Sequence, residues 1–180
     1  MIDRASFDPH AYPLEPWWFL RPGSIHGLGH TRRVLIHAAA LAEPADLTTV
    51  EFESLVLAAA WHDLGRTHDG FDPDHGRASV ARIIDLNLAG DVDPDLLEPM
   101  FFAVEWHSKD DELALQAAVA ASDTSPEADP RLRVLWTLKD ADGLDRVRIN
   151  DLDVNRLRSD AARARADEAW RLYREMESLA

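Results

Sequence analysis

The chain has 180 residues, of which 46% are hydrophobic, and its 19 basic and 33 acidic side chains give a net charge of −14. This composition excludes intrinsic disorder, and the acidic surface disfavours bulk nucleic acid as a partner, because non-specific binding to nucleic acid needs a cationic surface. The sequence has no cysteine, no secretory signal at its start and no apolar run near the roughly 18 residues that cross a membrane, so we expect a cytoplasmic protein with neither disulfides nor membrane contact.

The first 24 residues contain four prolines and no regular pattern, and we interpret residues 1–24 as an irregular arm. From residue 25 to residue 180 the apolar residues follow helical spacing, which predicts a single compact all-α domain. Seven helices are expected in chain order, over residues 30–43, 48–63, 75–90, 93–108, 111–123, 129–149 and 159–180.

Residues that favour helix ends set several of these boundaries. Thr48 or Thr49 is the expected N-cap of the second helix, and Pro130 is expected at the first position of the sixth. Gly90 is the expected C-cap of the third helix. Pro99 is expected either to break the fourth helix or to begin its main segment.

Histidine and aspartate gather near these helix ends, where side chains from different helices can converge on one point. Imidazole and carboxylate together are a ligand set that suits Mn, Fe, Co, Ni and Zn, and without cysteine any metal must be held by these groups. The pattern therefore predicts a divalent-metal site, with six candidate side chains: His30, His62, Asp63, His75, His107 and Asp142.

Three short motifs resemble the HD-domain superfamily of metal-dependent phosphohydrolases: HTRRV from His30, the HD doublet at positions 62 and 63, and ADGLD at 141–145. The resemblance runs from about residue 26 to residue 148. It implies that His30, His62, Asp63 and Asp142 are metal ligands. Asp142 is chosen over Asp140 and Asp145 because it follows Ala and precedes x-Leu, as in the family pattern. HGRASV and VEWHS resemble the additional histidines of two-metal members, which implies that His75 and His107 bind a second ion and that Asp63 bridges the two.

The segment after the doublet, LGRTHDGFDPDHG, is similar to loops of small HD proteins and implies that Arg66 lies near the site, where its guanidinium can bind a phosphate. Four further interpretations stay open at this stage. His26 is either a substrate contact or a loop residue, and His68 either lines the mouth of the site or is exposed. Lys139 either offsets charge during catalysis or forms an ion pair with nearby acids. Asp69 and Asp72 are candidate proton acceptors.

The first functional hypothesis is a phosphohydrolase that acts on a nucleotide or another small phosphate ester or anhydride. One or two divalent ions would activate a water as the nucleophile, with Asp63, Arg66 and Lys139 in catalytic roles and His26, Arg66 and His68 as substrate contacts. The alternative is a di-iron oxygenase, because related six-ligand sites support O₂ chemistry on small organic substrates. A non-catalytic binding module is the third possibility, and the intact His-Asp doublet argues against it.

Overall fold

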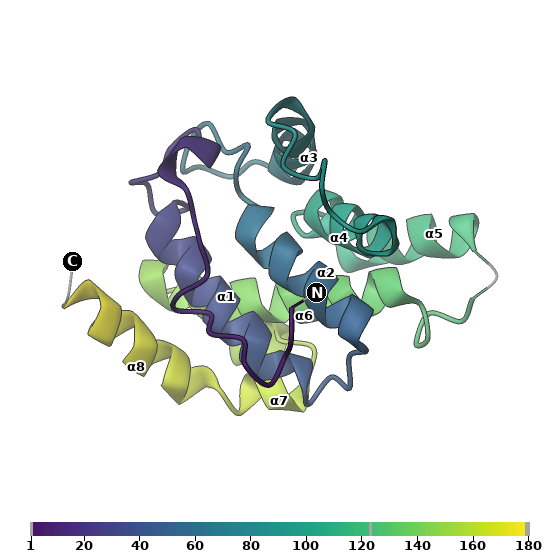
Figure 1. Cartoon of the computed structure of the whole chain (residues 1–180). Coiled ribbons are helices and arrows are strands. Elements are labelled where there is room, and N and C mark those ends of the chain that lie inside the picture. Colours follow the sequence, from purple (N-terminus) through teal and green to yellow (C-terminus); the bar gives the residue numbers. More distant parts are fainter. Residues whose placement is uncertain (1, 123, 179–180) are drawn as a thin grey trace.

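The computed structural model describes residues 2–122 and 124–178, which fold into α-helices and short 3₁₀ helices with no strand among them (Figure 1). This confirms the predicted all-α class. No helix in these residues is long and apolar enough to cross a membrane. The helices are α1 (Leu28–Ala42), α2 (Thr49–Trp61), α3 (His75–Asp85), α4 (Pro94–Trp106), α5 (Asp111–Ala121), α6 (Pro130–Leu144), α7 (Asp160–Arg163) and α8 (Ala166–Glu177).

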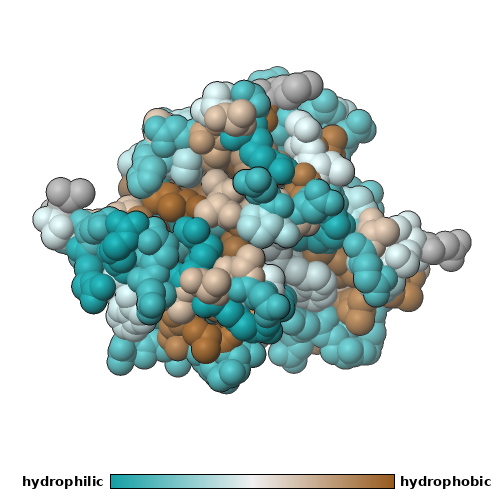
Figure 2. All heavy atoms as spheres, turned by 90° about the horizontal axis from the view of Figure 1, so that it is seen from below, coloured by the Kyte–Doolittle hydropathy of each residue, from teal (hydrophilic) through white to brown (hydrophobic). Residues whose placement is uncertain are grey.

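Helix α2 is the centre of the core. Every residue from Glu51 to Trp61 is buried, because the helix packs against α1, α4 and α6 and is apolar on all sides from Leu55 onward. Figure 1 shows α2 running through the middle of the molecule, with α3 above it and α8 at the lower left. Seen from below, the surface is mostly hydrophilic with hydrophobic residues gathered in patches (Figure 2), in keeping with the high charge of the chain.

Two of the predicted helix starts are confirmed. The Thr48 side chain accepts a hydrogen bond from the Glu51 backbone, and the Glu51 carboxylate accepts one from the Thr48 backbone. This reciprocal capping box satisfies two backbone donors that the helix itself leaves free. Pro130 occupies the first position of α6, and the preceding Asp129 caps that helix by accepting from the Arg131 backbone.

The prediction that Gly90 caps the third helix is wrong. Helix α3 ends at Asp85, and Asn87 adopts the left-handed conformation at φ 52°. The backbone of Leu88 then donates to the Ile83 carbonyl, which closes the last turn five residues early. Asparagine tolerates this conformation nearly as well as glycine does, because its short polar side chain bonds locally.

Pro99 neither breaks nor begins a helix, since α4 continues through it from Pro94 to Trp106. Proline has no N–H to donate to the carbonyl of Asp95 one turn earlier, and Asp95 is exposed. Two other boundaries also differ from the predictions. The sixth helix passes into a 3₁₀ helix over Asp145–Ile149, and the last divides into α7 and α8. Position 123, the predicted end of the fifth helix, lies outside the described residues.

The arm of the first 24 residues is largely irregular and carries one short 3₁₀ helix, Pro16–Trp18. It is fixed to the core by aromatic contacts. The ring of Phe7 meets Phe52 edge-on with centroids 5.5 Å apart, Trp18 meets Trp61 at 6.4 Å, and Phe19 is buried.

Glycine at position 76 lets the start of α3 approach the end of α4. A Cβ built there would lie 2.5 Å from the carbonyl oxygen of Val104 and 2.6 Å from that of Glu105. We expect Gly76→Ala to lower the free energy of unfolding by about 1–3 kcal/mol, because backbone must move to make room. Urea unfolding measures this. Gly23→Ala is the matched control, since a Cβ there meets nothing within 4 Å, and an equal loss in both variants would contradict the packing argument.

Candidate metal centre

Five helix ends deliver the predicted ligands to one place. His30 lies in the first turn of α1, His62 caps the C-terminus of α2 and His75 is the first residue of α3. His107 caps the C-terminus of α4. Asp63 follows directly after His62, and Asp142 comes from the last turn of α6. All four histidines and Asp63 are buried, whereas Asp142 is partly exposed to the cleft.

The imidazole nitrogens lie at the spacing of neighbouring metal ligands. The Nε2 atoms of His30 and His62 are 3.0 Å apart, and those of His75 and His107 are 2.7 Å apart. Two nitrogens that bind one ion at about 2.1 Å, at right angles, are separated by about 3.0 Å. Asp142 Oδ1 lies 3.4 Å from His30 Nε2 and so joins the first pair.

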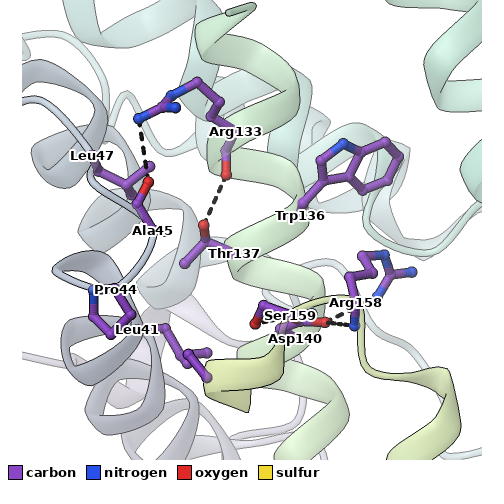
Figure 3. A pocket seen from close by; sticks show the side chains of 11 residues that line it. Leu41, Pro44, Ala45, Leu47, Arg133, Trp136, Thr137, Asp140, Arg158 and Ser159 are labelled. Carbon is purple, nitrogen blue, oxygen red and sulfur yellow. Dashed lines mark hydrogen bonds and ion pairs between the residues drawn. The ribbon is translucent and has the colours of Figure 1, made fainter. Parts of the chain in front are cut away.

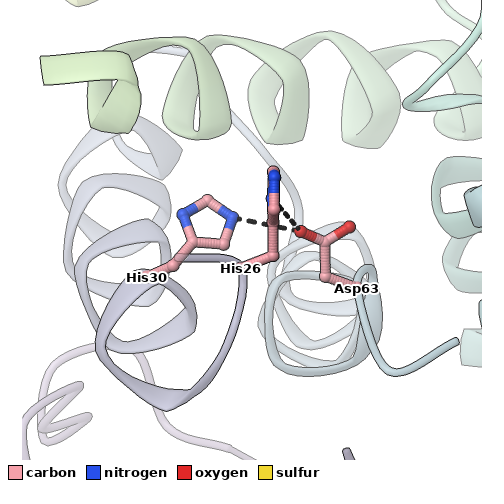
Figure 4. A group of neighbouring side chains, drawn as sticks. All are labelled: His26, His30 and Asp63. Atoms are coloured by element: carbon pink, nitrogen blue, oxygen red, sulfur yellow. Dashed lines mark hydrogen bonds and ion pairs between the residues drawn. The ribbon is translucent and has the colours of Figure 1, made fainter. Parts of the chain in front are cut away.

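The carboxylate of Asp63 stands between the two histidine pairs. Its Oδ2 atom is 3.4 Å from His30 Nε2 and 3.1 Å from His26 Nδ1 (Figure 4). Its Oδ1 atom is 3.1 Å from His75 Nε2 and 3.6 Å from His107 Nε2. One oxygen therefore faces each pair, which is the arrangement that a carboxylate bridging two ions requires.

The outer nitrogens of the four histidines fix which nitrogen faces the centre. The Nδ1 atoms of three of them donate to backbone carbonyls, at 2.9 Å from His62 to Ala59, 2.5 Å from His75 to Asp72 and 2.7 Å from His107 to Val104. His30 Nδ1 donates to the Asp145 carboxylate at 2.7 Å. A carbonyl cannot donate a proton, so in each neutral ring the proton is on Nδ1 and the lone pair of Nε2 points inward.

The electrostatics favour a lone pair over a proton on the inward-facing nitrogens of His62 and His107. Burial lowers the pKa of His62 to about 3 and also lowers the pKa of His107. Burial alone would raise the pKa of Asp63, but the surrounding histidines hold it well below its usual value. The pKa of His30 is raised instead, because its hydrogen bonds to Asp145 and Asp63 outweigh the effect of burial and of Arg148. Imidazole lone pairs that face one another beside ionised carboxylates suit a divalent cation.

The three neighbouring aspartates at the end of α6 and the start of the following 3₁₀ helix have different surroundings. Asp142 faces His30, as described above. Asp140 accepts from the backbone and hydroxyl of Ser159, at 2.9 and 2.7 Å, and thus ties α6 to the segment before α7. Asp145 is fully buried between His30 and Arg33, whose Nε donates to it at 2.5 Å.

Asp145 orients His30, and sequence reasoning assigned it no role. We expect Asp145→Asn to weaken metal binding by about 10–100-fold, because the amide holds the Nδ1 proton less strongly and a ligand losing its outer partner typically costs this much. Competition against a chelator measures the affinity. Asp140→Asn is the control, and a matching loss there would show that the effect is general destabilisation.

The other predicted site residues are placed as follows. Arg66 Nε lies 3.4 Å from Asp63 Oδ1, and its Nη1 donates to the Gly70 carbonyl. His26 sits in the turn before α1 with its Nδ1 3.1 Å from both Asp63 and Arg148. His68 is exposed, and its ring accepts from the Gly70 backbone.

Lys139 is bound to groups away from the ligands. Its Nζ donates to the Asp111 carboxylate at 2.7 Å and to the Lys109 carbonyl at 2.5 Å. This is the ion pair that sequence reasoning named as the alternative to a catalytic role.

A cleft with two lobes opens on the centre, with cavities of about 370 and 470 Å³. Both lobes reach His107, Asp142 and Arg146. The smaller lobe is also lined by Arg66, Arg148, Asp69 and Asp72, but not by His68. The larger is lined by Lys139 and Arg158. Sequence reasoning missed Arg146 and Arg148. Arg148 follows Asp145 at a spacing of three residues, and its Nη1 donates to the Asp145 carbonyl.

Comparison with known proteins agrees with this geometry. The model of the HD domain family matches residues 27–147, so the chain belongs to the HD-domain family, a superfamily of metal-dependent hydrolases. No curated protein and no solved structure gives a significant match.

Proposed function

We propose that this protein is a metal-dependent phosphohydrolase acting on a small anionic phosphate ester or anhydride, such as a nucleotide. The observation that carries the proposal is the set of four inward-facing Nε2 lone pairs around the Asp63 carboxylate. His30, His62 and Asp142 would hold one divalent ion, His75 and His107 a second, and Asp63 both. Bound ions would lower the pKa of a water molecule and polarise the phosphoryl oxygens.

The remaining steps fall to side chains of the cleft. Arg66 and Arg148, which line the smaller lobe beside Asp63, bind the phosphoryl oxygens and offset charge as the transition state forms. His26 is a substrate contact in this scheme, because its ring lies between Asp63 and Arg148. Asp69 or Asp72 takes a proton from the attacking water. Lys139 lines the larger lobe, and its role in this scheme is to hold the Asp111 carboxylate beside the cleft.

The proposal is tested by removing metals with a chelator and reloading the protein separately with Mn, Fe, Co, Ni and Zn. We expect phosphate release from a panel of phosphomonoesters and nucleotides only after reloading, with about two ions per chain by elemental analysis. One ion per chain would remove His75 and His107 from the ligand set. Failure to bind any ion would refute the proposal, and O₂ consumption by the iron form without phosphate release would support the oxygenase instead.

A further inference from the structure

A second cavity, of about 220 Å³, lies away from the metal centre (Figure 3). It is enclosed by the end of α1 with its following loop, by α6 and by the segment that begins α7. Asp140 lines it, whereas Asp142 faces the metal centre. Residues two apart on a helix point about 200° from each other, so α6 separates the two sites.

Six of the eleven residues that line this cavity are apolar, and the other five are polar or charged. Its apolar lining comes from Leu41, Pro44, Ala45, Leu47, Trp136 and Ala161, of which Leu41 and Leu47 are buried.

The charged groups around the cavity are already paired. Arg133 Nε donates to the Glu51 carboxylate at 2.6 Å, and Arg158 donates to Asp111 through two nitrogens at 2.8 and 2.6 Å. Asp140 accepts from Ser159, and the Thr137 hydroxyl donates to the Arg133 carbonyl at 2.8 Å. Among the described residues that line the cavity, no charged side chain is therefore left without a partner for an ionic ligand to pair with. An anion would have to compete with Glu51 for the guanidinium of Arg133 or with Asp111 for that of Arg158.

We propose that this cavity is a binding site for a small neutral ring compound, mainly apolar and about the size of a substituted benzene. A cavity of about 150 Å³ lined by apolar side chains is enough to hold benzene, so 220 Å³ accommodates one ring with a short substituent. The ring would pack between Leu41, Pro44 and Trp136.

Arg158 connects this cavity with the cleft of the metal centre. The residue lines this cavity and also the larger lobe of the metal-site cleft. Its guanidinium lies 5.5 Å from the centroid of the Trp136 ring, and it shares Asp111 with Lys139. A compound held against Trp136 therefore touches a side chain that forms part of both cavities.

The test compares benzyl alcohol with benzoate, which have nearly the same shape and differ in charge. The readout is the NMR signal of the Trp136 indole N–H, assigned with Trp136→Phe, in the full chain without added metal. We expect saturable shifts with benzyl alcohol at a Kd of about 1 mM, in the range for so few atoms, and binding of benzoate at least about tenfold weaker.

Ala161→Leu fills the cavity and is expected to weaken benzyl alcohol binding at least about tenfold. Ala128→Leu, at an exposed position outside the cavity, is the control and should leave the Kd unchanged. Circular dichroism checks the fold, and Ala45→Leu replaces Ala161→Leu if the latter does not fold. Absence of saturable binding, tighter binding of benzoate, or indifference to the filling variants would overturn the proposal. Because no metal or phosphate takes part, these results are independent of the proposed hydrolase activity.

Discussion

Asp63→Asn is expected to reduce the metal content to less than one ion per chain and phosphate release by about 10³-fold. Asp63 is the only side chain among those described that faces both histidine pairs, with Oδ2 toward His30 and Oδ1 toward His75. An amide of the same shape keeps one acceptor and loses the negative charge. A bound metal contributes several kcal/mol to transition-state stabilisation, and about 4 kcal/mol corresponds to about 10³ in rate.

Elemental analysis and the phosphate assay, run on the same preparation, measure both effects of this substitution. Asp91→Asn is the matched control, because Asp91 is exposed and lines neither lobe of the cleft. The control should retain the metal and the activity. If Asp63→Asn kept its activity with a native circular dichroism spectrum, the carboxylate would have no part in the chemistry.

His37→Leu is expected to stabilise the protein, and to do so more strongly in mild acid. His37 is fully buried in α1, and neither ring nitrogen has a hydrogen-bond partner among the described residues. Replacing such a group by an apolar side chain of similar size removes a penalty of about 1–3 kcal/mol, so we expect a gain of that order near pH 7.

The acid effect follows from the pKa of His37, which burial lowers to about 4 from its usual 6.5. Between these values the unfolded chain binds a proton at this position and the folded chain does not, so the free energy of unfolding decreases as the pH falls from 6.5 toward 4. At about pH 5 this loss amounts to about 2 kcal/mol. The leucine variant does not suffer it.

Urea unfolding at about pH 7 and about pH 5 tests both parts. The gap between variant and wild type should widen by about 2 kcal/mol at the lower pH. His10→Leu makes the same change at an exposed position in the arm and should shift stability by less than about 0.5 kcal/mol. Parallel pH profiles for wild type and His37→Leu would show that His37 is not a source of acid sensitivity.

The sequence was sufficient to predict the all-α fold and the set of side chains that meet at the centre. Apolar periodicity marks the helices, and motifs at helix ends mark His30, the His62–Asp63 doublet and Asp142. These signals are local, so they can be read without knowledge of the packing. The start of α2 could also be predicted from the sequence, because the capping box lies within four residues.

Features that depend on contacts between residues far apart in the chain could not be predicted from the sequence. Asp145 and Arg148 acquire their roles from His30, Arg33 and His26, which lie more than 100 residues away in the chain. The end of α3 was misplaced for another reason. Two residues, Asn87 and Gly90, both suit a helix terminus, and the tertiary packing of the following residues decided between them.

Some helices point their N-terminus at the metal centre and others point their C-terminus at it, so their backbone dipoles oppose one another. α2, α4 and α6 end there, whereas α1 and α3 begin there. Each terminus carries about half an elementary charge, negative at the C-terminus and positive at the N-terminus, so the two N-termini offset two of the three C-termini and a small negative contribution is left. The field at the centre is then set by side chains, chiefly Asp63 and Asp142 against Arg66 and Arg148. Because the backbone contribution is small, we expect an exchange of a few of these side chains to change the preferred ion or substrate.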